Sequence, residues 1–360
     1  MKTYKSALIG VSRMGAFIDN EGSTPKLPTS HAAAYEASDR TEIVACSDLR
    51  VDVMEQFGKR YGVAKEHQYV DYKEMVEREK PDIVSVATQP EPRSEIVVYL
   101  AEHGIKAIYA EKAMAASTRE ADAMVEAVER NGVVFNLGTN RRWDPGFDTM
   151  KELIDSGTIG DLKTIIIYDN GTLFNMSSHW FDIMLRLNND RPVSWVQAHL
   201  QDGADFLDGD LLPEDPSGHG IIQFEDGVTG YALLTGRQSE VEAICERGVV
   251  TALGSGQWKV SGPGPMDHRG KHSPVPLEFP AFEPRSSSVA LVEDLANSLD
   301  SGEPTRGGVR VARAVLDLIF AFIESHRRGG ARVTLPLTDS NVRLQRDRAP
   351  RPPTYERLTD

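Results

Sequence analysis

The sequence predicts an α/β protein with an N-terminal doubly wound parallel sheet and a C-terminal α+β domain built on a large, mostly antiparallel open sheet. Over the first 140 residues, short apolar runs alternate with amphipathic helices, which is typical of a parallel sheet covered by helices. After about residue 150, alternating strands are separated by Gly-rich turns. A length of 360 residues fits two domains. We place them at residues 1–140 and 141–360, and the last helices are able to pack back on the first domain.

The strands of the first domain are expected to be buried on both faces, because their apolar runs are continuous. They are Ser6–Ile9, Glu42–Ser47, Ile83–Ala87, Lys106–Ala110 and Val133–Leu137. Helices are expected at Arg93–His103 and Thr118–Asn131, the second beginning with a capping box of Ser117 and Glu120. A sheet of this kind binds its ligand beyond the carboxyl ends of its strands.

In the second half, strands are expected at Val228–Leu234, Gly248–Leu253 and Gln257–Val260, and helices at Ser288–Leu299 and Gly308–His326. Two loops stand out by composition. Gln201–Gly218 is acidic without a basic residue, and we interpret it as a solvated loop. Gly262–Pro276 is rich in Pro, Gly and His, which predicts a surface loop.

Composition narrows the possible partners and the compartment. Asp and Glu total 54 against 40 Lys and Arg, a formal net charge of -14, which argues against a duplex-DNA or anionic-membrane partner. The N-terminal apolar run ends at Gly10, too early for a signal peptide, and the apolar segment Val309–Ile323 is interrupted by charges. Cys46 and Cys245 are too few and too far apart for a zinc knuckle or a disulfide framework. We therefore expect a cytoplasmic protein that binds neither nucleic acid nor membrane and holds no metal.

A dinucleotide fingerprint follows the first predicted strand. The segment Gly10–Gly15 has glycines at both ends and Ser12 in place of the second glycine. Its small residues permit a tight turn and a close approach of the backbone to a pyrophosphate at the start of the next helix. By itself, such a pattern can also indicate a tight turn that binds no cofactor.

An acidic residue at the end of the second strand supports the fingerprint. Asp48 lies 33 positions after Gly15, but the turn-rich segment Asp19–Ser30 has the composition of a 12-residue insertion, and without it the spacing is 21. A carboxylate there binds the ribose 2′-OH and repels a 2′-phosphate, which favours NAD. Arg50 keeps NADP open as an alternative, and Asp48 can also act as a helix N-cap.

Two further groups are candidates for the chemistry. Lys112 follows the fourth predicted strand, which lies beside the first in this topology, so it is expected at the crevice; the alternative is a solvated lysine. Asn175, His179 and Asp182 have spacings of four and three, which place them on one face of a helix. The alternative for His179 is a structural role.

With these residues together, the chain resembles the Gfo/Idh/MocA oxidoreductases, which are named for glucose–fructose oxidoreductase and inositol dehydrogenase. The matching motifs, spread over nearly the whole chain, are the Gly10–Gly15 turn, Thr88-Gln-Pro90, Ala110–Met114, Thr139–Trp143, Ile159–Leu162, His179 with Asp182, and Ser325 with Leu335–Leu337. The order and spacing of these motifs make the resemblance specific.

The resemblance implies a Rossmann domain, an NAD cofactor and a set of site residues. The family's Glu-Lys-Pro motif falls on Glu111, Lys112 and Ala113, and its lysine contacts the substrate hydroxyl and the nicotinamide ribose. Its Asp-x-x-x-His pair falls on Asn175 and His179, and the histidine of its Thr-Pro-x-x-x-His segment falls on Arg93, so both segments depart from the pattern. The expected cofactor contacts are Gly10, Ser12, Arg13, Met14, Gly15, Asp48, Leu49, Arg50, Thr88, Gln89, Glu111 and Lys112.

The expected chemistry is transfer of a hydride from a substrate carbon to nicotinamide while a base removes the hydroxyl proton. His179 is suited to that proton because an unperturbed imidazole titrates near ~6.5. Lys112 can share it, and Asn175 can orient a hydroxyl or the imidazole but cannot stabilise imidazolium as a carboxylate does.

The substrate contacts are expected to be Lys112, Arg142, Trp143, Tyr168, Asn175 and His179. Alternatives stay open for two of them: Trp143 is also compatible with a core aromatic, and Arg142 with a salt bridge at the domain junction. Tyr168 shares a strand face with Asn170, in a region that faces the substrate in related proteins. The insertion Asp19–Ser30 is expected either to cover the site or to be a plain surface loop.

Three functions remain possible on this sequence. The first is an NAD-dependent dehydrogenase that oxidises a secondary hydroxyl of a sugar, glycoside or cyclitol. The second is a redox-assisted glycoside hydrolase that returns the hydride, towards which Asn175 and Ala113 add weight. The third is a silent NAD-binding regulator, against which Lys112 and His179 argue. By resemblance, we expect a homodimer or homotetramer formed through the open sheet face.

Overall fold

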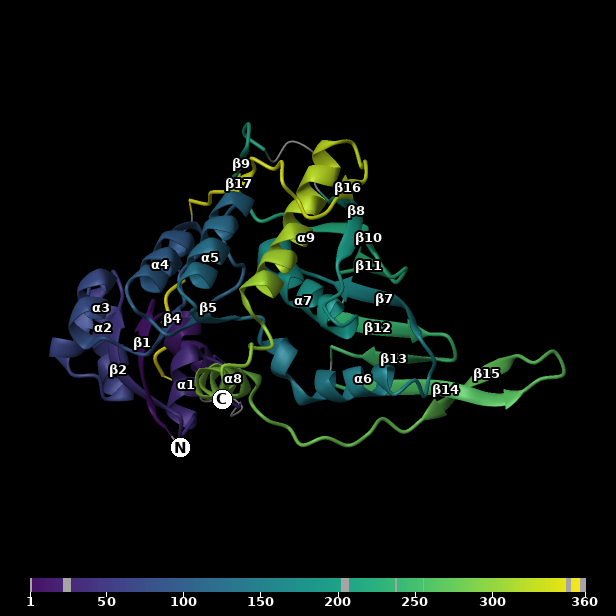
Figure 1. Ribbon diagram of the computed structural model, residues 1–360, viewed down its shortest axis with the longest axis horizontal. Coiled ribbons are helices and arrows are strands. Elements are labelled where there is room, and N and C mark those ends of the chain that lie inside the picture. The colour runs from purple at the N-terminus through teal and green to yellow at the C-terminus, as the bar shows by residue number, and fades with distance from the viewer. Residues whose placement is uncertain are drawn as a thin grey trace. The chain divides into compact units, whose positions relative to one another are not determined.

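The computed structural model describes residues 2–21, 27–201, 207–236, 238–254, 256–347 and 351–356 (Figure 1). The chain forms two compact units. The first consists of Met1–Trp143, Arg285–Arg313 and Asp347–Asp360, and the second of Asp144–Pro284 and Ala314–Arg346. The first unit therefore contains two C-terminal segments in addition to residues 1–140.

The first unit contains a parallel sheet (Figure 1). Within the described residues, this sheet has six strands. In spatial order they are β3 (Gln68–Tyr69), β2 (Thr41–Ser47), β1 (Tyr4–Ile9), β4 (Ile83–Val86), β5 (Ala107–Ala110) and β6 (Val134–Leu137). This order reverses between β1 and β4 and confirms the predicted doubly wound fold. The five predicted strands are all present, but the prediction that the strand before Lys112 lies beside the first strand is wrong, because β5 pairs with β4 and β4 pairs with β1. The sequence did not indicate β3, because two residues carry no periodicity.

Helices cover this sheet, and all but the last of them connect its strands. They are α1 (His31–Ala37), α2 (Val51–Tyr61), α3 (Tyr72–Glu79), α4 (Pro90–Glu102), α5 (Thr118–Arg130) and α8 (Ser287–Ser301). Helix α4 begins at Pro90, three residues before the predicted start, because proline is well tolerated in the first turn of a helix. Helix α5 begins as predicted, with Ser117 Oγ accepting a hydrogen bond from the Glu120 amide at 3.2 Å.

The turn after β1 depends on its two glycines. Gly10 has φ +83, which favours glycine, and a Cβ on Gly15 would lie 2.0 Å from the Gly10 carbonyl oxygen. After Gly10, the chain makes a π-helical turn over Arg13–Phe17 and a 3-10 turn over Ile18–Asn20 in place of one long helix.

The segment Asp19–Ser30 then closes on itself. The Asp19 carboxylate accepts hydrogen bonds from the amides of Thr29 (2.6 Å) and Ser30 (3.0 Å). Ser30 is also the N-cap of α1, so the chain re-enters regular structure as soon as the segment ends. Residues 22–26 lie outside the described residues, and whether this segment covers the site stays a prediction.

The second unit is built on a sheet that has nine strands within the described residues, paired antiparallel except for β7 with β11. In order, they are β15 (His272–Leu277), β14 (Trp258–Met266), β13 (Gly248–Ala252), β12 (Glu240–Cys245), β7 (Leu162–Asp169), β11 (Thr229–Leu234), β10 (Gly218–Phe224), β8 (Val193–Leu200) and β16 (Val333–Thr334). A separate pair joins β9 (Leu211–Leu212) to β17 (Arg343–Leu344). The mostly antiparallel sheet confirms the prediction.

Helices α6 (Pro145–Asp155) and α7 (Ser178–Leu187) belong to the second unit, and α9 (Val309–Arg327) begins in the first unit and ends in the second. Helix α7 lies directly against β11: a Cβ on Gly230 would be 2.3 Å from the Met184 sulfur. Gly230 pairs with Ile165 of β7, so α7 covers the sheet face on which Ile165 is buried.

The prediction of a surface loop at Gly262–Pro276 is wrong. These residues belong to the hairpin of β14 and β15, in which Ser261 pairs with Pro276 and Gly262 with Val275. Strand β15 is at the edge of the sheet, and an edge strand tolerates proline because half of its amides have no partner strand. The Pro and Gly content that suggested a loop therefore marks an edge hairpin.

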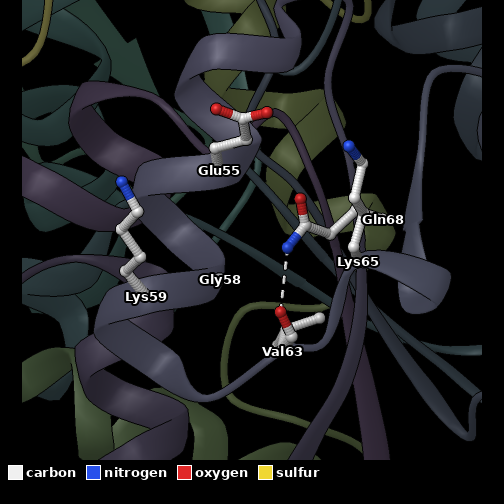
Figure 2. Close-up of a pocket in the computed structure, with 6 residues that line it drawn as sticks. All are labelled: Glu55, Gly58, Lys59, Val63, Lys65 and Gln68. Carbon is white, nitrogen blue, oxygen red and sulfur yellow. Dashed lines mark hydrogen bonds between the residues drawn. The ribbon is translucent and has the colours of Figure 1, made fainter.

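A shallow pocket lies where α2 meets β3 (Figure 2). Gln68 Nε2 donates a hydrogen bond to the Val63 carbonyl at 2.8 Å, and a Cβ on Gly58 would lie 2.1 Å from the same nitrogen. Gly58 therefore permits this close approach of helix and strand. The residues that line the pocket are Glu55, Gly58, Lys59, Val63, Lys65 and Gln68, none of which is a predicted site residue.

We expect Gly15→Ala to destabilise the first unit by about 1–3 kcal/mol, because its methyl group would meet a backbone carbonyl that cannot move aside like a side chain. The matched control is Ser12→Ala, since the Ser12 side chain makes no capping hydrogen bond. The control should change stability by less than about 0.5 kcal/mol. Urea unfolding followed by circular dichroism measures both. Equal stability of the two variants would contradict the assigned role of Gly15.

Candidate active site

Asp48 joins the glycine turn to the end of β2. Its Oδ2 accepts a hydrogen bond from the Val11 amide and its Oδ1 accepts one from the Arg50 amide, both at 3.0 Å. The Arg50 guanidinium Nε lies 3.6 Å from the same carboxylate. The N-cap of α2 is Arg50, so the alternative in which Asp48 is the N-cap is wrong. A carboxylate fixed at this point of the turn suits the ribose hydroxyl role.

The other predicted cofactor residues differ in their surroundings. Leu49 is 85% exposed and Gln89 is also exposed, whereas Ser12 and Met14 are half-buried. The Arg13 guanidinium pairs with Glu21 at 2.5 Å, which ties the turn to the start of the Asp19–Ser30 segment.

The glycine turn and the residues at the ends of β2 and β4 fit a dinucleotide. Within the described residues, the buried Thr88 Oγ1 has no hydrogen-bond partner, as expected for a hydroxyl that meets a ligand. Gly10 and Gly15 allow the backbone to form the tight turn that a pyrophosphate site requires, and Asp48 presents a fixed carboxylate. Gly10, Gly15, Asp48 and Thr88 are thus the residues that would hold NAD.

Lys112 lies in a turn whose backbone is held by a buried carboxylate. Glu111 is 5% exposed, and its carboxylate accepts hydrogen bonds at 3.1 Å from His31 Nε2 and from the Lys112 amide. His31 is fully buried, its Nδ1 is 2.9 Å from Ser85 Oγ, and its ring stacks on Tyr109 at 3.7 Å. The Lys112–Ala113 peptide bond is cis.

Sequence reasoning did not find His31 or Ser85. No motif marks them, because α1 and β4 bring them to Glu111 only in the folded chain.

The Glu111 carboxyl is ionised in spite of its burial. Burial alone raises the pKa of Glu111, but the hydrogen bond from His31 and the charges of His31, Lys112 and Arg93 outweigh it and hold the pKa below its ordinary value. The turn that presents Lys112 therefore contains a fixed negative charge.

His179 and Asp182 lie in α7, and both are at most 9% exposed. Asn175 is exposed and lies before α7, in a π-helical turn over Leu173–Ser177. The prediction that Asn175, His179 and Asp182 share one face of a single α-helix is therefore wrong for Asn175, because the spacing of four assumes α-helical geometry. Lys112 belongs to the first unit, whereas Asn175 and His179 belong to the second.

The π-helical turn that carries Asn175 is held by Asp215. Its carboxylate accepts hydrogen bonds from the Thr172 hydroxyl (2.6 Å) and from the amides of Phe174 (2.9 Å) and Asn175 (3.0 Å). Burial raises the pKa of Asp215, although these hydrogen bonds act in the opposite direction. The prediction that Gln201–Gly218 is simply a solvated loop is thus wrong at Asp215; Asp202 and Asp205 lie outside the described residues.

Asp169, at the end of β7, holds the other side of this segment. Its carboxylate accepts hydrogen bonds from the Ser177 hydroxyl and the Asn170 amide, both at 2.7 Å, and from the Gly171 amide at 3.1 Å. Sequence reasoning named neither Asp169 nor Asp215, because an aspartate that caps a turn looks like any other loop aspartate.

The surroundings of three predicted substrate residues do not indicate a contact with substrate. Trp143 is 1% exposed in the core of the first unit, which favours the core-aromatic interpretation. Arg142 is also buried, and its Nη1 donates to the Arg306 carbonyl at 3.2 Å, which indicates a structural role. Tyr168 alternates with Ile165 and Ile167 along β7 and so lies on the sheet face opposite α7, with its hydroxyl 3.3 Å from Glu242. The structure does not bring Tyr168 to His179.

A family model described as "Oxidoreductase family, NAD-binding Rossmann fold" matches residues 24–139. Myo-inositol 2-dehydrogenase of Thermotoga maritima is 24% identical over 306 residues, which are 78% of this chain and 87% of that protein. D-apiose dehydrogenase of Paraburkholderia graminis is 32% identical over 160 residues, 44% of this chain and 38% of that protein.

Solved structures share the fold over nearly the full chain. Levoglucosan dehydrogenase, in complex with NADH and L-sorbose, has a TM-score of 0.75 at 18% identity and covers 94% of this chain and 100% of its own. Aldose–aldose oxidoreductase from Caulobacter crescentus, complexed with glycerol, has a TM-score of 0.76 at 17% identity, covering 93% and 100%.

The parallel sheet, the glycine turn and the family model define an oxidoreductase with an NAD-binding Rossmann domain. Residues 24–139 match the Gfo/Idh/MocA model, and the family's resemblance extends to a relative that covers 78% of this chain. Within the described residues, no group of His, Cys, Asp or Glu is arranged to hold a metal ion, and no helix is long and apolar enough to span a membrane.

We expect His31→Ala to cost about 3 kcal/mol of unfolding free energy at pH 7.5, because it leaves the buried Glu111 carboxylate without its donor. The lowered pKa of Glu111 stabilises the fold above the ordinary glutamate pKa, and this contribution is lost as pH falls through the folded-state pKa. The difference between variant and parent should therefore shrink as pH falls below about 4.5. Urea unfolding across this range measures it.

The control for this prediction is His103→Ala, since His103 is exposed and its ring stacks on Tyr99. Its effect should be small. A destabilisation by His31→Ala that is the same at pH 4 and pH 7.5 would contradict the role of the Glu111 charge.

We expect Asp215→Ala to increase amide hydrogen exchange in residues 172–178 by about tenfold or more, because two of those amides lose their acceptor. Glu214→Ala is the matched control, as Glu214 is the exposed neighbour in the same loop. Exchange measured by mass spectrometry that is unchanged in Asp215→Ala would show that another contact holds the turn.

Proposed function

We propose that the protein is an NAD-dependent dehydrogenase that oxidises a secondary hydroxyl of a sugar, glycoside or cyclitol. One observation carries this proposal: the Rossmann sheet carries both the glycine turn and, after β5, a lysine whose turn is fixed by buried side chains. The names of the relatives, which include inositol and apiose dehydrogenases, support this substrate class.

NAD, when bound, supplies the nicotinamide carbon that accepts a hydride. Lys112 is assigned to bind the substrate hydroxyl with its ammonium group, because its backbone is held at the carboxyl edge of the sheet by Glu111. His179 is assigned to accept the hydroxyl proton, a task for which imidazole is suited near neutral pH. Asn175 is assigned to orient the hydroxyl, since its amide offers both a donor and an acceptor.

The preference for NAD over NADP rests on the Asp48 carboxylate. A 2′-phosphate at that position would meet a negative charge fixed by the Val11 and Arg50 amides. The Arg50 guanidinium lies beside Asp48, where part of its charge is compensated, so it is a weaker partner for a phosphate.

A subunit contact through the open face of the nine-stranded sheet is part of the proposal. Leu233 of β11 is 36% exposed, and Ile166 and Tyr168 of β7 are half-buried. A homodimer or homotetramer would cover this face, and light scattering at several concentrations measures the assembly.

We expect Lys112→Ala to lower kcat by about 10²–10⁴-fold, because it removes the group that binds the substrate hydroxyl. We expect His179→Ala to lower kcat by about 10²-fold or more, because it removes the group that accepts the hydroxyl proton. The assay follows absorbance at 340 nm and sugar release over a panel of sugars, glycosides and cyclitols. Lys59→Ala, at the pocket of Figure 2, is the matched lysine control and should retain full activity.

The same assay distinguishes the other functions. NADH formed in step with product is the expected result. Sugar release without net NADH, from protein that retains nucleotide after purification, would assign a redox-assisted glycosidase instead. Full turnover by Lys112→Ala would refute the assignment of Lys112.

A further inference from the structure

Arg93 of α4 is an arginine buried almost completely, with 1% of its surface exposed. Its Nη1 donates a hydrogen bond to the Ala113 carbonyl and its Nη2 donates one to the Thr88 carbonyl. Arginine is rarely buried to this extent, since removing its charge from water is costly unless the guanidinium is satisfied. A planar guanidinium with fixed donors is suited to hold two carbonyl groups at once.

The two carbonyl groups belong to neighbouring turns at the carboxyl edge of the sheet. Thr88 follows β4, and Ala113 follows β5 and Lys112. The strands pair as far as Val86 with Ala110, and the Glu111 amide still donates to the Val86 carbonyl at 3.0 Å. Beyond that point the ladder ends, and the Arg93 guanidinium connects the two turns.

The charge of Arg93 is also matched locally. The Glu111 carboxylate is buried in the same turn, and the positive charge of Arg93 is among the causes that hold its pKa down. A buried cation and a buried anion each reduce the cost of the other. Arg93 and Glu111 thus restrain the backbone at Lys112 and just after it: Glu111 accepts from the Lys112 amide, and Arg93 donates to the Ala113 carbonyl.

We propose that Arg93 is a positioning residue that fixes Lys112 by clamping the Ala113 carbonyl to the Thr88 turn, and that it replaces the restraint of a proline at position 113. This rests on the function proposed for Lys112. The resembled family has proline where this chain has Ala113 and histidine where it has Arg93, and in the structure these two departures meet in one hydrogen bond. Proline restricts its own backbone. Alanine does not, so the restraint comes from Arg93.

The test is a double-mutant cycle of Arg93→Met and Ala113→Pro, with Arg93→Lys as a third variant. Methionine keeps an unbranched apolar side chain without donors, and lysine keeps the charge but lacks the planar fork. Arg40→Met is the matched control, because Arg40 is another buried arginine of the first unit, bonded to Asn297 and Asp300 far from this turn in the sequence. The readouts are kcat, KM for NAD and amide exchange of residues 86–89 and 111–116.

We expect Arg93→Met and Arg93→Lys to lower kcat at least tenfold, to change KM for NAD less than threefold and to speed exchange in both segments. Ala113→Pro should raise kcat at least threefold in the Arg93→Met background and change it less than twofold in the parent. Arg40→Met should lower thermal stability without changing exchange in the two segments.

The clamp is refuted if Arg93→Met loses only thermal stability, as Arg40→Met does, or if proline has the same effect in both backgrounds. Amide exchange needs no substrate, so it tests the clamp even if every compound in the panel is inert. Full turnover by Lys112→Ala would instead refute the role proposed for Lys112 and leave the exchange result standing.

Discussion

The candidate site of the first unit depends on one buried anion, the carboxylate of Glu111. His31 donates to it from α1, the Lys112 amide donates to it from the same turn, and Arg93 brings a compensating charge from α4. An unpartnered buried carboxylate would take up a proton and release these donors. With the three partners in place, the carboxylate connects two helices to the lysine turn after β5.

In the second unit, too, carboxylates hold the backbone next to the candidate site residues. Asp169 and Asp215 accept hydrogen bonds from both sides of the segment between β7 and α7 and so fix the start of the helix that carries His179. In both units, a carboxylate holds the backbone amide of a candidate residue, Lys112 in the first unit and Asn175 in the second. Preorganisation of this kind is what precise proton handling requires.

The sequence predicted the fold well because the fold follows from patterns of local residues. The five main strands of the Rossmann sheet, the glycine turn and the antiparallel sheet are all visible as apolar runs, small residues and alternation. The errors have a physical cause as well. Proline and glycine in an edge hairpin resemble a loop, and β3 is too short to show a period.

The site was predictable only where a motif carries it. Lys112, His179 and the glycines belong to such motifs, whereas His31 and Asp215 act through contacts with residues far away in the chain, and Asp169 looks like any other loop aspartate. The burial of Trp143 and Arg142 favours structural roles for both residues. A single sequence does not reveal which of its side chains are buried. Arg93 was noticed as a departure from the family pattern, but its contact with Ala113 required the folded chain.

The most direct test of this account is the pKa of Glu111, measured by ¹³C NMR on protein labelled in the glutamate carboxyl carbons, with Glu111→Gln to assign the resonance. The account predicts that this carboxyl stays ionised below the ordinary glutamate pKa, because the partners outweigh its burial. A Glu111 carboxyl that takes up its proton near neutral pH would contradict the account, since the turn of Lys112 would then not be organised around a buried charge.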